Sequence, residues 1–189
     1  VIMDLDETVL DNSPYNWKLV LENSNYMPET WAQWVQLEEA SFIPGFMEFY
    51  RYAMNRGVAI RFISNRSHRQ LQATMKNMAK NGLDLDSSNF LLKTETSSKI
   101  ERRKLVAEQA SIIMLIGDNL ADFNDAFDQK ELGISERKNL VKAYAMEFGT
   151  RFIVLPNTMY GAWLKAVELD YLKAQQNSLE GPKRYIQSY

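Results

Sequence analysis

The chain has 189 residues, of which 46% are hydrophobic and 24% charged, and its formal net charge is −2. This composition fits one globular domain with a sizeable core, and it argues against a disordered chain or a basic nucleic-acid-binding protein. The chain has no cysteine and one histidine, His68, which excludes disulfides, thiol catalysis and a histidine-rich metal cluster.

Apolar runs typical of strands alternate with helix-length segments along the chain. Strands are expected at 1–5, 58–64, 89–92, 111–117 and 151–156. Apolar residues at helical spacing predict helices at 45–57, 67–82 and 97–110. Gly57 and Gly82 are the expected C-terminal caps of the first two helices, and Ser67 and Ser97 are the expected N-caps of the last two. This alternation predicts an α/β fold with a mainly parallel sheet.

The segment between the first strand and the helix at 45 breaks the alternation. It has about 30 residues, rich in tryptophan and tyrosine, where a strand-to-helix connection usually needs only a few. We interpret about 14–43 as a small, mostly helical cap insert over the strand ends of a single domain. The core of that domain would comprise about 1–13 and 44–175, followed by a polar tail at about 176–189.

Polar residues follow nearly every predicted strand. Ligands of open parallel sheets bind beyond the carboxyl ends of the strands, so these residues are the candidates for a functional site. In chain order they are Asp4, Asp6 and Thr8, then Ser64, Asn65 and Arg66, then Lys99 at a helix start, then Asp118 and Asp122, and finally Asn157 and Tyr160.

This set of side chains suits phosphoryl transfer. Aspartates that converge at one point offer the oxygen ligands that Mg²⁺ prefers. One carboxylate can attack phosphorus, and a second carboxylic acid two residues on can exchange a proton with the leaving oxygen and with water. Ser64 and Lys99 can bind the non-bridging oxygens of the transferred group.

The same residues resemble a known family. "DLDET", "ISNR", an isolated lysine and "GDNLADF" resemble the four motifs of the haloacid dehalogenase (HAD) superfamily. "DLDETVLDNSPY", "GDNLADF" and "PNTMYGAW" are similar to its class C nonspecific acid phosphatases, also called DDDD phosphohydrolases, over about 1–165. The resemblance implies a HAD-like Rossmannoid fold, with three α/β/α layers and a cap after the first strand.

The resemblance also implies a role for each motif residue. Asp4 would be the nucleophile and a magnesium ligand. Asp6 would be the general acid and base, and would bind magnesium through its backbone carbonyl. Asp118 would complete the metal ligands, while Ser64 and Lys99 would bind phosphate.

Further positions follow from the same resemblance. Asp122 would support the site by pairing with Lys99 or with a metal-bound water. Trp31 and Tyr160 would flank a nucleobase or another substrate ring, and the expected substrate-binding set also includes Thr8 and Asn65.

Several of these residues have an alternative interpretation. Arg66 can be a structural ion-pair partner or a substrate contact, and the sequence leaves both open. Trp31 and Trp34 lie three residues apart, a spacing that usually indicates packing, and we assign only Trp34 to packing. Lys99 competes with a basic helix face formed by Arg102, Arg103 and Lys104. His68, Asp125 and Asp128 are expected to face solvent.

The sequence therefore predicts a Mg²⁺-dependent acid phosphatase that hydrolyses phosphomonoesters, such as nucleoside monophosphates and aryl phosphates, through an aspartyl-phosphate. The alternatives are another HAD phosphotransferase such as a sugar phosphomutase, a receiver domain, or a non-catalytic surface protein that binds nucleotides. No nucleic-acid polymer is expected as a partner, and a homodimer remains open. The family resemblance implies a bacterial cell-surface lipoprotein or secreted protein, although the sequence does not show whether a signal peptide or lipid-attachment signal precedes residue 1.

Overall fold

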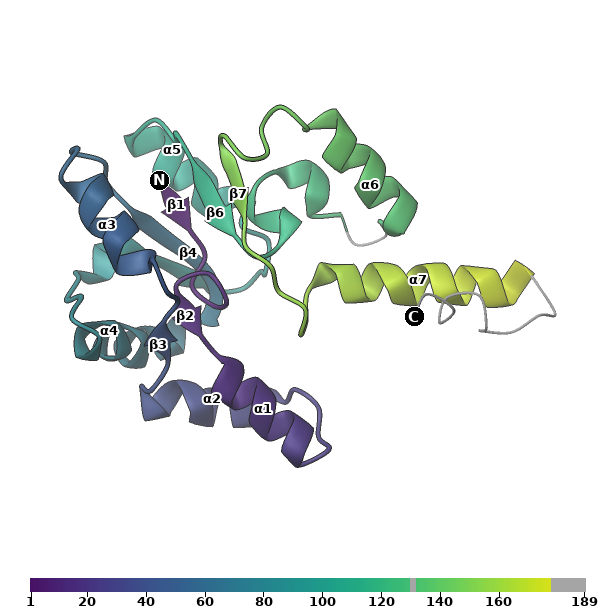
Figure 1. The fold of residues 1–189 in the computed structure, drawn as a ribbon, viewed down its shortest axis with the longest axis horizontal. Coiled ribbons are helices and arrows are strands. Elements are labelled where there is room, and N and C mark those ends of the chain that lie inside the picture. Colours follow the sequence, from purple (N-terminus) through teal and green to yellow (C-terminus); the bar gives the residue numbers. More distant parts are fainter. Residues whose placement is uncertain (130–131, 178–189) are drawn as a thin grey trace.

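The structure, a computed structural model, describes residues 1–129 and 132–177 (Figure 1). The polar tail predicted at about 176–189 lies almost entirely outside the described residues. Five parallel strands form the main sheet in the order β5-β4-β1-β6-β7. They are β1 (Ile2–Met3), β4 (Arg61–Ser67), β5 (Phe90–Lys93), β6 (Leu115–Gly117) and β7 (Phe152–Val154). The predicted α/β class with a parallel sheet is confirmed.

The sheet is covered on both faces because successive strand residues point to opposite sides. Met3 and Phe62 belong to one buried cluster, and Ile2 and Ile63 belong to a second. The helices α3 (Phe46–Met54) and α4 (Leu71–Lys80) contribute to the first cluster, whereas α5 (Ile100–Gln109) and the end of α6 (Ile134–Ala143) lie at the second. The result is the predicted three-layer arrangement.

The predicted cap insert contains two helices, α1 (Ser13–Leu21) and α2 (Pro28–Leu37). Each has a proline in its first turn, where the missing N–H leaves no hydrogen bond unmade. The short antiparallel strands β2 (Leu10–Asp11) and β3 (Ser41–Phe42) pair at the base of the insert and return the chain to the core. Figure 1 shows α1 and α2 projecting beyond one end of the main sheet.

Helix boundaries differ from the sequence prediction at all three predicted helices. The helix predicted at 45–57 is α3, which ends at Met54 with Asn55 rather than Gly57 as its C-cap. The helix predicted at 67–82 begins with the 3₁₀ turn η1 (His68–Gln70), and Ser67 caps that turn through a reciprocal bond with Gln70. Ser97 is not the N-cap of α5, because that helix begins after Lys99. The turn at 94–99 is therefore longer than predicted, and it brings Lys99 rather than a serine to the start of the helix.

The remaining described elements are short 3₁₀ turns and one long helix. The turns are η2 (Ser87–Asn89), η3 (Leu120–Asp122) and η4 (Asp125–Phe127). After β7 the chain enters α7 (Ala162–Asn177), which extends away from the sheet in Figure 1. Within residues 1–129 and 132–177, the helices are too short or too polar to cross a membrane.

Candidate active site

The site is built around the end of β1, the central strand of the sheet. Asp4 follows β1 directly, and its amide donates to the carbonyl of Ile116 in β6 at 3.0 Å. The chain then turns tightly, because the amides of Thr8, Val9 and Leu10 all donate to the carbonyl of Leu5, at 2.8–3.3 Å. Asp4 is thus fixed between β4 and β6, at the point where a parallel sheet with this strand order binds ligands.

Lys99 links two of the aspartates. Its side chain is 5% exposed, and its Nζ lies 2.8 Å from Asp4 Oδ1 and 2.6 Å from Asp122 Oδ1. Burial by itself would lower the pKa of Lys99, but the Asp122 and Asp4 carboxylates raise it above its usual value. The lysine therefore stays charged, and it makes the pairing with Asp122 that the sequence predicted.

The loop after β6 explains why glycine and asparagine accompany these aspartates. Asp122 Oδ2 accepts a hydrogen bond from the Asn119 amide at 2.9 Å, and Asn119 Oδ1 accepts one from Ala121, which forms a capping box around η3. A side chain at Gly117 would collide with the Asp122 carboxylate. "GDNLAD" is therefore the pattern that turns Asp122 back toward Lys99.

Three carboxylates converge at this point, because Asp4, Asp118 and Asp122 each place an oxygen within 4.8 Å of the others. Burial raises the pKa of Asp4 well above its usual value, and the neighbouring acids add to that effect while Lys99 opposes it. Burial, and then Asp122, raises the pKa of Asp118 to about 6, against the effect of the Asn157 amide that donates to Asp118 at 2.7 Å. A single ammonium leaves excess negative charge here, which suits a divalent cation with oxygen ligands.

Asp6 faces a different cation. Arg66 is 2% exposed, and its Nε and Nη2 donate to Asp6 Oδ1 at 3.0 and 2.8 Å. Arg66 Nη1 also donates to Thr74 at 3.1 Å. Of the two roles that the sequence left open for Arg66, the structure therefore shows the ion pair. Asp6 lies outside the group of three carboxylates, and its predicted role as a metal ligand through the backbone carbonyl stays a prediction.

Ser64 and Asn65 lie within β4 rather than after it, because the strand extends to Ser67 through a shift in register. Ser64 is buried, and its Oγ accepts from the Arg66 amide at 3.1 Å. Asn65 is exposed and accepts from Arg102 Nη2 at 2.7 Å. Arg102 also donates to the Ser64 carbonyl at 2.5 Å, so it holds the middle of β4 in place.

Asn12 is a site residue that sequence reasoning missed. It is fully buried, its Nδ2 donates to Asp6 Oδ1 at 3.0 Å and Glu7 Oε2 at 3.3 Å, and its Oδ1 accepts from Trp34 Nε1 at 2.8 Å. Its position before α1 suggests an N-cap, but its side chain makes no capping bond. Arg102 was likewise predicted only as part of a basic face, although it lies one helical turn after Lys99.

Trp34 and Trp31 occupy different environments, as predicted. Trp34 is buried and hydrogen-bonded, whereas Trp31 is partly exposed and packs edge-on against Tyr15, with ring centroids 5.2 Å apart. The guanidinium of Arg66 lies 5.6 Å from the Trp31 ring centroid. Trp31 is therefore next to the cation that holds Asp6, and its predicted contact with substrate stays a prediction.

Glu7 connects the turn after β1 to two distant segments. Its Oε2 accepts from Asn12 and from the hydroxyl of Tyr160, and its Oε1 accepts from Asn16 at 3.4 Å. Burial, with a contribution from Asp6, raises the pKa of Glu7 to about 8, while the Asn12 hydrogen bond lowers it. Glu7 was not among the predicted site residues, and Tyr160, which was, is 37% exposed.

Thr8 is buried in the turn after β1, and its predicted substrate contact stays a prediction. Its side chain is 2% exposed, and its Oγ1 is buried without a hydrogen-bond partner in the described part of the chain. The tight turn that displays Asp6 and Glu7 directs Thr8 inward. By contrast, His68 is exposed as predicted, and Asp125 is exposed and pairs with Arg103.

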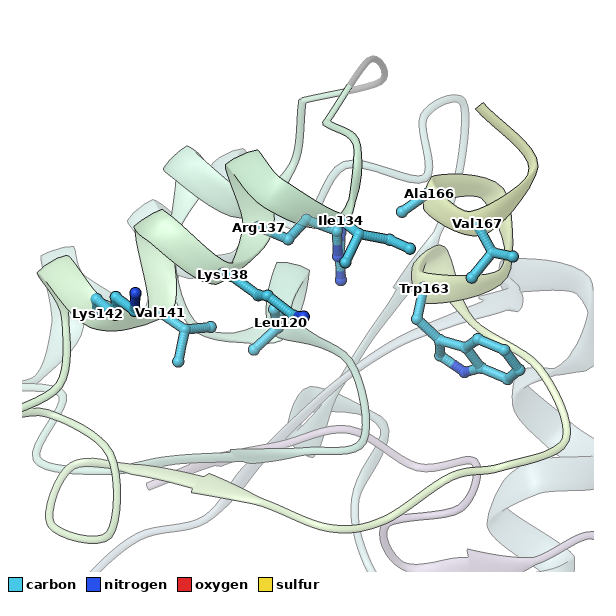
Figure 2. Close-up of a pocket in the computed structure, with 9 residues that line it drawn as sticks. All are labelled: Leu120, Ile134, Arg137, Lys138, Val141, Lys142, Trp163, Ala166 and Val167. Carbon is cyan, nitrogen blue, oxygen red and sulfur yellow. The ribbon is translucent and has the colours of Figure 1, made fainter. Parts of the chain in front are cut away.

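A separate groove of about 510 Å³ lies between α6 and α7 (Figure 2). Its walls combine apolar side chains with three cations, and they comprise Leu120, Ile134, Arg137, Lys138, Val141, Lys142, Trp163, Ala166 and Val167. Leu120 belongs to the same 3₁₀ turn as Asp122, yet the three clustered aspartates do not line this groove. It is therefore distinct from the aspartate site.

Comparisons with known proteins agree with this geometry. The family model described as HAD superfamily, subfamily IIIB (acid phosphatase), matches residues 1–163. The structure of the class C acid phosphatase from Bacillus anthracis superposes with a TM-score of 0.82 at 35% identity, and the match covers 96% of this chain and 79% of that one. The structure of that class C acid phosphatase with tungstate bound gives a TM-score of 0.80 at 34% identity, with the same coverage.

Proposed function

This chain belongs to subfamily IIIB of the HAD superfamily, the acid phosphatases, and from that premise we propose that it hydrolyses phosphomonoesters through an aspartyl-phosphate on Asp4. The observation that carries the proposal is the position of Asp4. It lies at the end of the central strand, 2.8 Å from a buried lysine and within the group of three carboxylates. A nucleophile toward phosphorus needs this combination of a fixed carboxylate and nearby positive charge.

In the first step, a carboxylate oxygen of Asp4 bonds to phosphorus as the ester bond to the leaving group breaks. Lys99 lies beside the attacking carboxylate and can neutralise a non-bridging oxygen, while Asp122 holds the ammonium in place. Ser64, which is buried within β4, would bind another non-bridging oxygen. Water then attacks the aspartyl-phosphate, which releases phosphate and restores Asp4.

Asp6 would act as the general acid in the first step and as the general base in the second. It would donate a proton to the leaving oxygen, and it would later remove one from the attacking water. The two carboxylates have different partners, since Asp4 contacts Lys99 whereas Asp6 contacts Arg66 and Asn12. This separation supports a division of roles between two residues that are only two positions apart.

We further propose that Mg²⁺ is the cofactor, held by Asp4, Asp118 and the backbone carbonyl of Asp6. The residues present fit such an ion, because three carboxylates converge with raised pKa values on Asp4 and Asp118. When bound, the cation would neutralise the carboxylates and the phosphate oxygens that approach them. The related phosphatase was solved with tungstate bound, a tetrahedral oxyanion like phosphate, which supports a phosphoryl substrate.

The proposed substrates are esters with a planar leaving group, such as aryl phosphates and nucleoside monophosphates. Trp31 and Tyr160 are the partly exposed aromatic residues that lie next to Arg66 and Glu7, and they would contact the leaving group. Asn65 is exposed within β4 and remains a proposed contact. The family resemblance also supports a bacterial location outside the cytoplasm.

A phosphate-release screen tests this function. Wild-type protein would be assayed on p-nitrophenyl phosphate, nucleoside 5′-monophosphates and sugar phosphates, with Mg²⁺ or with a chelator, from acid to alkaline pH. We expect Mg²⁺-dependent release from many esters, whereas a mutase would transfer phosphate without releasing it. Asp4→Asn should lower kcat by at least about 10³-fold. The exposed Asp84→Asn is the matched control, since Asp84 precedes β5 and so lies toward the edge of the sheet opposite the carboxyl ends of the strands.

Metal binding has a second measurement that does not depend on turnover. Mg²⁺ should raise the melting temperature of the wild type, because a ligand that binds only the folded state stabilises it. Asp118→Asn should lose most of that increase, and Asp84→Asn should keep it. Hydrolysis of p-nitrophenyl phosphate by Asp4→Asn at the wild-type rate would refute the proposed nucleophile.

A further inference from the structure

The backbone of Tyr160 is anchored to the active site. Asn157 Oδ1 accepts from the amides of Met159 at 2.9 Å and Tyr160 at 3.3 Å, while its Nδ2 donates to Asp118. The indole of Trp163, which lines the groove in Figure 2, donates to the Tyr160 carbonyl at 3.2 Å. These contacts fix the position of the Tyr160 backbone, but they do not fix the direction of its ring.

The direction of the ring depends on the hydroxyl, which donates to Glu7 Oε2. Because Glu7 directly follows Asp6, this contact brings the phenol next to the proposed acid and base. The Glu7 carboxylate is itself held by the amides of Asn12 and Asn16. In the described part of the chain no lysine or arginine pairs with Glu7, so its hydrogen-bond donors are neutral groups.

The backbone at Glu7 is unusual for a glutamate. Its φ is +57°, in the left-handed region that glycine and asparagine adopt most easily. A long acidic side chain at such a position is disfavoured unless it makes contacts that a glycine could not make. The contacts seen are those to Asn12, Asn16 and Tyr160, which join the turn after β1 to α1 and to the loop after β7.

We propose that Glu7 is a positioning residue, whose carboxylate holds the Tyr160 hydroxyl so that the phenol ring is fixed beside the active site and favours substrates with a planar leaving group. This inference rests on the proposed phosphatase function, and it adds a determinant of selectivity. Glu7 acts on the ring and not on the reacting atoms, so its loss should raise KM for aryl esters more than it lowers kcat.

The test is a double-mutant cycle with two substrates. Tyr160→Phe removes only the hydroxyl, and Glu7→Asn shortens the side chain by one methylene and replaces the carboxylate with an amide, while suiting the left-handed backbone. Each variant should raise KM for p-nitrophenyl phosphate about three- to tenfold, as expected for loss of one hydrogen bond. KM for glycerol 3-phosphate should change by less than about twofold, and the double variant should be no worse than either single one. Tyr52→Phe, at an exposed tyrosine beside Arg56, is the matched control.

Several outcomes would overturn the inference. Equal rises in KM for both substrates would indicate a general structural role, and additive effects in the double variant would show that the two side chains do not act through one contact. If Glu7→Asn does not fold, Tyr160→Phe alone still tests the inference. A KM of Tyr160→Phe for the aryl ester equal to that of the wild type would reject the inference. Absence of phosphate release by the wild type would instead reject the proposed function itself.

Discussion

Two regions of the site are built in different ways. The ion-pair centre, formed by Asp4, Asp6, Arg66, Lys99 and Asp122, comes from strand ends and adjoining turns, and its cations are 2–5% exposed. The aromatic rim, formed by Trp31 and Tyr160, comes from a cap helix and a loop, and both of its side chains are partly exposed. The centre is held by several short ionic contacts, whereas the rim side chains are held by ring packing at Trp31 and by a hydrogen bond at Tyr160.

Because of this difference, substitutions in the ion-pair centre and in the aromatic rim should affect different properties of the protein. Removing one partner of a buried ion pair costs about 3–5 kcal/mol, because it leaves an uncompensated charge. A single aromatic contact or neutral hydrogen bond contributes about 0.5–1.5 kcal/mol. Substitutions in the centre should therefore alter catalysis or folding strongly, whereas substitutions in the rim should change substrate preference and leave the fold intact.

The largest effect should come from Asp6→Asn, which tests whether Asp4 and Asp6 have different catalytic roles. Without the proton from Asp6, turnover of alkyl phosphates should fall by about 10²–10⁴-fold. p-Nitrophenolate leaves without protonation, so the first step with p-nitrophenyl phosphate should survive. Stopped-flow measurements should then show a burst of p-nitrophenolate followed by slow turnover, whereas Asp4→Asn should give no burst. A missing burst in Asp6→Asn would mean that Asp6 is needed for attack itself.

Arg66→Met should have the next largest effect. It leaves the Asp6 carboxylate without the arginine that donates at 2.8 and 3.0 Å, so the free energy of unfolding should fall by about 3–5 kcal/mol. Urea denaturation would measure this loss. Adding Asp6→Asn should recover part of the stability, because the unpaired charge is gone. Arg56→Met, at an exposed position, is the control, and an equal loss in both variants would contradict this account of the centre.

Much of this centre could be predicted from the sequence. In a parallel sheet the strands end at one edge, so the aspartates after the first and fourth predicted strands had to converge. Asp4, Asp118 and Asp122 do converge, and Lys99 lies between two of them. The five strands were also predictable, because each is a short apolar run between polar turns.

The contacts between segments were not predictable from local pattern. Asn12 looks like a helix cap and is instead the junction between Asp6, Glu7 and Trp34. The sequence alone could not decide whether Arg66 forms an ion pair or contacts the substrate. Arg66 was expected after the strand, whereas β4 continues through it. The burial of Thr8 was not predictable either, because a turn residue looks exposed in sequence, whereas the amides that converge on the Leu5 carbonyl turn Thr8 inward.

The smallest predicted effect contrasts two tryptophans on the same helix. Trp31→Leu removes a partly exposed ring beside Arg66, so KM for aryl phosphates should rise about two- to fivefold, with a loss of stability below about 1 kcal/mol. Trp34→Phe removes the donor to the buried Asn12 Oδ1, so it should cost about 1–3 kcal/mol in stability without changing the preference for aryl over alkyl esters. Steady-state kinetics and urea denaturation of both variants would measure the contrast. If Trp34→Phe altered that preference as much as Trp31→Leu does, the buried part of the cap would also contribute to selectivity, and the separation of centre from rim would fail.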